Sequence, residues 1–167
     1  MIQLRSDLAD VHRATRGSLS SAGTWWSARA RRALADTAVR AMWAADALPP
    51  WATNEAVAGF VSPGGLDDAP VTAHRAVARM ARHASTIDRA WYESIIAELG
   101  ALEYVELVGL VCVVAATSSL RHSLGLDATE LVPATDAPAS RTAPPALADA
   151  QLNWVPVAAP ADASAAV

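Results

Sequence analysis

The sequence predicts an all-α protein, a helical bundle followed by an irregular C-terminal tail rich in proline and alanine. Its 167 residues are 53% hydrophobic but only 5% aromatic, so the core is expected to consist mainly of Ala, Val and Leu. Small side chains suit closely packed helices, whereas strands favour β-branched and aromatic residues. The length fits one domain. We expect a helical domain over residues 1–126 and a tail, or linker, over 127–167 that is mobile or wraps the surface.

The first two helices are predicted from capping residues and apolar spacing. Residues 4–16 form the first, with Ser6 as its N-cap and Gly17 as its stop. The second is expected from a cap at Thr24 to the prolines at 49 and 50, whose rings clash with a preceding helical turn. Its apolar residues recur on one helical face: Leu34, Ala38, Ala41, Ala45 and Leu48.

Shorter elements are predicted for the middle of the chain, residues 51–100. A short helix over 51–61 is followed by a Ser-Pro-Gly-Gly turn at 62–65 and a further helix over 72–84. Ser85 opens the pattern Ser-Thr-Ile-Asp, which is typical of a capping box. Another helix is therefore expected to start there and to end at Gly100.

The helix predicted from about residue 102 to 124 is the longest. Its many valines would also suit a buried strand, but a run of this length without proline exceeds a typical strand. Glu103 and Glu106 in the first turn, and Arg121 and His122 in the last, complement the helix dipole. Because the helix is apolar on nearly every side, we expect it at the centre of the bundle or at a contact between subunits.

The segment 88–127, DRAWYESIIAELGALEYVELVGLVCVVAATSSLRHSLGLD, resembles the carboxymuconolactone decarboxylase and alkylhydroperoxidase D superfamily. The motif Y-V-E-L-V-G, followed by a valine-rich helix, carries the resemblance, which implies a helical bundle of the alkylhydroperoxidase D-like type. In peroxidase members, a helix that opens with a glutamate continues to a Cys-x-x-Cys pair, with a histidine four residues after the second cysteine. Counted from Glu106, these three positions fall on Ser118, Arg121 and Gly125. The chain thus resembles the half of the family that lacks the redox pair.

Three functions remain open. In the first, the chain is a peroxidase-related domain that is non-catalytic or weakly catalytic and serves as an assembly half. In the second, it is a cysteine-independent, decarboxylase-like enzyme that acts on a small organic acid, with Glu106 and His122 as catalytic groups and Trp25 and Trp26 lining the substrate pocket. The third is a helical module that binds a small ligand. Each residue also has a structural interpretation: helix-dipole complementation for the two charged groups, and core packing for the two tryptophans.

Composition and charge limit the classes of partner that the chain is expected to bind. A net charge of −4 argues against nucleic acid, which needs a basic face. The longest apolar run is about half the roughly 20 residues that cross a bilayer, and no signal peptide is seen, so a cytoplasmic protein without a membrane span is expected. The partner is expected to be a further copy of the chain, bound through the 102–124 helix, or a second alkylhydroperoxidase D-like half.

Little in the sequence points to a metal or a cofactor. No His-x3-His or Glu-x2-His spacing occurs, and no glycine-rich phosphate loop is present, so neither is expected. Cys112 is the single cysteine, which rules out a disulfide within the chain. Midway along an apolar helix, its thiol is expected to be buried, protonated and inert.

Overall fold

The computed structural model describes residues 4–44, 68–142, 147–148 and 157–158. Within them the fold is helical, as the composition predicts. The helices are α1 (Ser6–Ser18), α2 (Ala28–Trp43), α5 (Val71–His83), the 3-10 turn η1 (Ala84–Thr86), α6 (Arg89–Leu99) and α7 (Ala101–Ser123). Two two-residue strands, β1 (Leu147–Ala148) and β2 (Val157–Ala158), pair antiparallel. The helix predicted over 51–61 and the turn at 62–65 lie outside the described residues.

Two helix starts differ from the predicted ones because other side chains cap them. The Ser27 side chain accepts a hydrogen bond from the Ala30 amide, so α2 begins at Ala28 and not near Thr24. In α6 the Asp88 carboxylate accepts from the Trp91 amide at 2.8 Å. Helix α6 therefore begins only after the predicted capping box, whose first residue lies in η1. In both helices the cap is the polar side chain that directly precedes the first helical residue.

Both predicted ends of helix α1 were wrong. It begins at Ser6, and its N-cap residue is Arg5, which makes no side-chain cap hydrogen bond. It also continues through Gly17 to Ser18. A Cβ at Gly17 would meet no atom within 4 Å, so this glycine is not required by a tight turn. By contrast, Gly100 ends α6 as predicted, with a φ of 99° that favours glycine.

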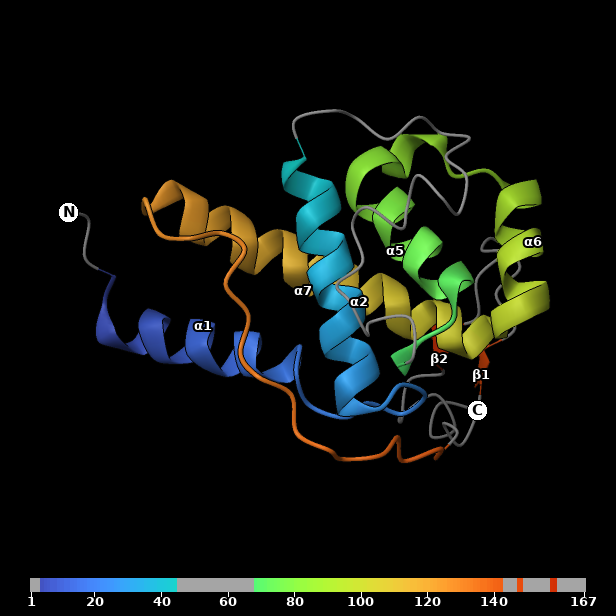
Figure 1. Ribbon diagram of the computed structural model, residues 1–167, viewed down its shortest axis with the longest axis horizontal. Coiled ribbons are helices and arrows are strands. Elements are labelled where there is room, and N and C mark those ends of the chain that lie inside the picture. Colours follow the sequence, from blue (N-terminus) through green and yellow to red (C-terminus); the bar gives the residue numbers. More distant parts are fainter. Residues whose placement is uncertain (1–3, 45–67, 143–146, 149–156, 159–167) are drawn as a thin grey trace, which may run out of the picture.

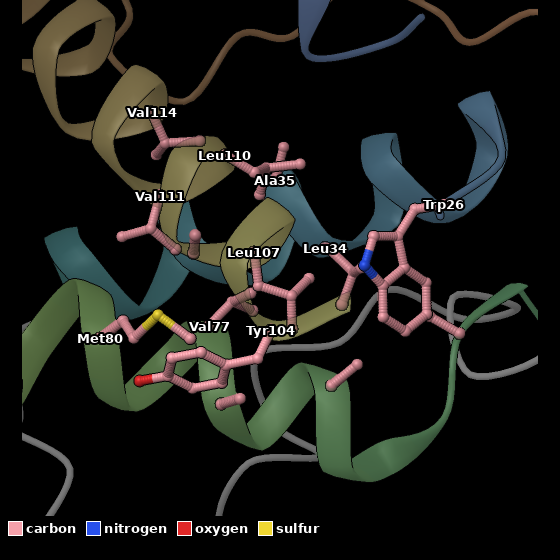
Figure 2. Close-up of a cluster of buried hydrophobic side chains, with 14 of the residues drawn as sticks. Trp26, Leu34, Ala35, Val77, Met80, Tyr104, Leu107, Leu110, Val111 and Val114 are labelled. Carbon is pink, nitrogen blue, oxygen red and sulfur yellow. The ribbon is translucent and has the colours of Figure 1, made fainter. Parts of the chain in front are cut away.

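The core forms where α2, α5 and α7 meet. Helix α7 contacts each of α1, α2, α5 and α6, and α2 crosses it (Figure 1). Its inward side chains gather with those of α2 and α5, as Figure 2 shows. The labelled cluster is Trp26, Leu34, Ala35, Val77, Met80, Tyr104, Leu107, Leu110, Val111 and Val114. Small and branched aliphatic side chains dominate this core, in agreement with the composition.

The first part of the tail lies along the surface in a defined path. Residues 127–142, which we call the strap, have no regular secondary structure and run from the end of α7 past α1 to the start of α2 (Figure 1). The backbone holds them at three points: the Ala28 amide donates to the Ala137 carbonyl, and the Ser140 and Arg141 amides donate to the carbonyls of Gly23 and Thr24. Side chains add further bonds, among them Ser20 Oγ to the Val132 carbonyl at 2.5 Å. The surface-wrapping form of the predicted tail is therefore the one observed for these residues.

Amide exchange tests this attachment. We expect the Ser140 and Arg141 amides to exchange with solvent deuterium more slowly than the Asp7 amide, because they donate to backbone carbonyls at 3.1 and 2.8 Å. The Asp7 amide lies in the first turn of α1, where amides have no partner within the helix. Hydrogen exchange resolved to single amides by NMR makes the comparison. Equal rates at the three positions would contradict the strap.

Candidate functional site

Glu106 forms a mostly buried ion pair that joins α7 to the start of α2. Its Oε1 lies 2.5 Å from Nη1 of Arg31, and its Oε2 accepts from the Trp25 amide at 2.7 Å. The two charged side chains are only 13% and 15% exposed. Arg31 also donates through Nη2 to the Ser18 carbonyl at 3.1 Å. Both carboxylate oxygens are therefore occupied by donors, and these bonds tie the loop between α1 and α2 to α7.

Gly23 is required by this ion pair. A Cβ at that position would lie 1.8 Å from Glu106 Oε1 and 2.7 Å from Arg31 Nη1, so the ends of both charged side chains would have to move and the ion pair would lose its present geometry. The Gly23 amide donates to the Trp26 carbonyl at 2.9 Å, and its carbonyl accepts from the strap at Ser140. The backbone at residue 23 thus fits between the carboxylate and the strap because it carries no side chain.

His122 lies far from Glu106. The two residues are sixteen positions apart on the same helix, which corresponds to about 24 Å at 1.5 Å per residue. The exposed His122 ring stacks on Trp43 with 4.5 Å between centroids, and the Trp43 indole nitrogen donates to Ser118 Oγ at 2.5 Å. The structure does not bring the two predicted catalytic residues together on one small substrate.

The two positions at which the resemblance would place the cysteine pair carry side chains with contacts inside the chain. Ser118 is buried and donates through its hydroxyl to the Ala128 carbonyl at 2.8 Å. Arg121 is also buried, donates to the Asp127 carbonyl at 2.6 Å and pairs with Glu130. Both side chains tie the start of the strap to the end of α7. The histidine position, Gly125, has a φ of 70° just beyond the helix end, a conformation that favours glycine.

The two tryptophans predicted for a substrate pocket lie against the core. Trp26 belongs to the buried cluster, and its indole nitrogen donates to the Glu103 carbonyl at 3.2 Å. Trp25 is partly buried and packs on the same cluster. This arrangement agrees with the packing interpretation given for them from the sequence, and their binding role stays a prediction.

Cys112 is exposed, contrary to the expectation that its thiol is buried. The reason is that the other helices cover only one side of α7 and leave the opposite side exposed. Leu107, Leu110 and Val114 face the other helices, whereas Cys112 lies on the opposite side.

By length and composition alone, α7 could also cross a membrane, but the core helix of a soluble protein can be equally long and apolar.

The core also contains contacts between polar side chains and between aromatic rings that the sequence did not predict. His74 and Thr37 are both fully buried, with 2.7 Å between Nδ1 and Oγ1, and join α5 to α2. Between α6 and α7, the rings of Tyr92 and Tyr104 meet edge to face at 5.0 Å. Burial raises the pKa of both phenols above the usual value. Isolated polar residues in helical stripes give no sequence signal for such pairing.

No protein-family model, curated protein or solved structure matches this chain. The resemblance to the alkylhydroperoxidase D superfamily therefore rests on the residues quoted above. Among residues 4–44 and 68–142, no three His, Cys, Asp or Glu side chains gather in a way that would hold a metal ion.

Proposed function

We propose that this chain is an alkylhydroperoxidase D-like helical unit that lacks the redox pair and serves in assembly, in the cytoplasm, together with a second helical unit. The observation that carries the proposal is the use of the family's reactive positions. Glu106 is tied to Arg31 and the Trp25 amide, and Ser118 and Arg121 hold the strap. All three side chains are held by contacts within the chain, which supports a role in the fold.

The alternative function, an enzyme, requires that its catalytic side chains reach the same substrate. A decarboxylase-like reaction by Glu106 and His122 requires both side chains at one substrate, and their separation along α7 does not favour it. The ligand-binding alternative would draw on Trp25 and Trp26, which pack against the core. Assembly is favoured because α7 has an exposed side without charge, which a second unit would cover.

We expect the isolated chain to show no thiol peroxidase turnover. Such turnover needs one thiol to attack the peroxide and a second thiol to resolve the sulfenic acid, and the chain has a single cysteine. Cys112 is exposed, so hydrogen peroxide has access to it, but at most one equivalent of simple oxidation is expected. Apart from that one equivalent, Cys112→Ser and the wild type should therefore consume peroxide at the same slow rate in a spectrophotometric assay with a reductant that is not a thiol, because an added dithiol would itself reduce the sulfenic acid. Multiple turnovers in the wild type that are lost in Cys112→Ser would contradict the proposal.

A further inference from the structure

Polar side chains hold the first part of the strap through its main-chain carbonyls. These donors, which we call the strap-binding surface, come from α1, the loop after it, α2 and α7, and are Arg16, Ser20, Arg32, Ser118 and Arg121. At 2.5–3.1 Å they donate to the carbonyls of Asp127, Ala128, Glu130 and Val132. Every residue type carries a carbonyl, so such bonds hold a peptide backbone whatever its side chains are.

Two arginines of this surface converge on one carboxylate of the strap. Arg121 pairs with Oε2 of Glu130, and Arg16 lies 3.6 Å from the same oxygen while it donates to the Glu130 carbonyl. The arginine side chains are only 10% and 13% exposed, whereas the Glu130 side chain is 59% exposed. Burial, and then the nearby charge of Arg121, lower the pKa of Arg16 below its usual value. Two neighbouring cations that are largely buried favour an occupant with a negative charge.

The strap is held by this surface and not by bonds to itself. Its backbone hydrogen bonds go to positions 23, 24 and 28, and within the described residues none joins two parts of the strap. It follows an open path from the end of α7 to the start of α2 (Figure 1). Leu131 adds an apolar contact, because it packs on the buried cluster. The strap is thus bound in the manner of an extended peptide on a protein surface.

We propose that the strap-binding surface is a site for an extended segment of a partner protein in which an acidic residue precedes an aliphatic one. The strap occupies this site while the partner is absent, and Glu130 and Leu131 supply the two features within the chain. When a partner segment replaces the strap, one set of carbonyls and one carboxylate replaces another, so neither arginine loses its acceptor. Binding at this site does not depend on the assembly proposed above.

A peptide added to the full chain tests the site. The probe is a synthetic peptide with the sequence of residues 126–134, LDATELVPA, and a fluorophore at its N-terminus. The attached strap competes with it at an effective concentration on the order of millimolar. Replacing both Glu130→Ala and Leu131→Ala in the chain weakens this competition. The double variant should therefore bind the peptide at least about tenfold more tightly than the wild type does, as measured by fluorescence anisotropy.

A second peptide, in which alanine replaces the glutamate, tests the preference for an acidic segment. The double variant should bind it at least about tenfold more weakly than the first peptide, because hydrogen bonds to a charged group are stronger than those to a neutral one. Equal binding of the two peptides would overturn the proposed role of the two arginines. A folded double variant that leaves the first peptide unbound at millimolar concentration would overturn the site itself.

Asp136→Ala is the matched control. This strap carboxylate is 93% exposed and lies 3.8 Å from the exposed side chain of Arg29, so its loss should leave the strap in place. The control should bind the peptide as weakly as the wild type does, and tight binding by it would contradict competition at Glu130. Circular dichroism establishes that each variant is folded. The single variant Glu130→Ala, which changes a side chain that is 59% exposed, makes the same comparison without loss of the Leu131 contact.

Discussion

Replacing Glu106 by Ala should lower the free energy of unfolding by about 3 kcal/mol, since removal of one partner leaves the other charge largely buried and unpaired. The Arg31 guanidinium would lose its acceptor at 2.5 Å, and the Trp25 amide would lose its own at 2.7 Å. Water reaches the Arg31 guanidinium only in part, because that side chain is 15% exposed. Urea denaturation followed by circular dichroism measures the loss.

An exposed ion pair of the same type provides the control. Glu93 pairs with Arg89 at 2.8 Å, but these side chains are 56% and 75% exposed. Because solvent screens such a pair, Glu93→Ala should cost at most about 0.5 kcal/mol. Glu106→Gln keeps an acceptor for the Trp25 amide and should fall between the two alanine variants. Equal losses for Glu106→Ala and Glu93→Ala would refute a stabilising role for the buried pair.

The second large effect is expected in the core. Leu107 is completely buried where α7 meets α2 and α5, and Figure 2 places it at the centre of the labelled cluster. Leu107→Ala should cost about 2–5 kcal/mol, from lost burial and from the cavity that remains. The measurement is again the urea midpoint, taken at one protein concentration so that association does not change between samples.

The same substitution in α1 serves as the comparison. Leu8 is 49% exposed, and α1 contains no buried residue. Leu8→Ala should therefore change the free energy of unfolding by less than about 1 kcal/mol, since little apolar surface is removed from contact. If the Leu8 variant lost as much stability as the Leu107 variant, the assignment of α7 as the central core helix would be wrong.

Helix type was largely determined by the sequence, although α2 ends at Trp43 and not at the prolines at 49 and 50. The stripe of α2 predicted Leu34, Ala38 and Ala41 as inward residues, and all three are completely buried. The predicted 102–124 helix corresponds to α7 within one residue at each end, and Gly100 separates it from α6. These features depend on local periodicity, on chain length without proline and on the backbone freedom of glycine, all of which are properties of neighbouring residues.

Helix starts were less well determined, because several polar residues near each start are able to cap it. Ser27 and Asp88 provide the caps of α2 and α6, although Thr24 and Ser85 matched capping patterns equally well in the sequence. The choice depends on where the preceding loop can place the first helical residue. For α2 that loop is fixed by Glu106, which is distant in the sequence.

Only the tertiary structure decided what the candidate site residues do. Glu106 meets Arg31 across 75 positions of the chain, and no local pattern encodes that pairing. Periodicity showed that α7 is apolar nearly all round, but not which side the other helices cover, and so Cys112 was expected to be buried although it is exposed. The reason is physical: helical spacing specifies which residues share a face, whereas burial and charge pairing depend on which other segments of the chain pack against that face.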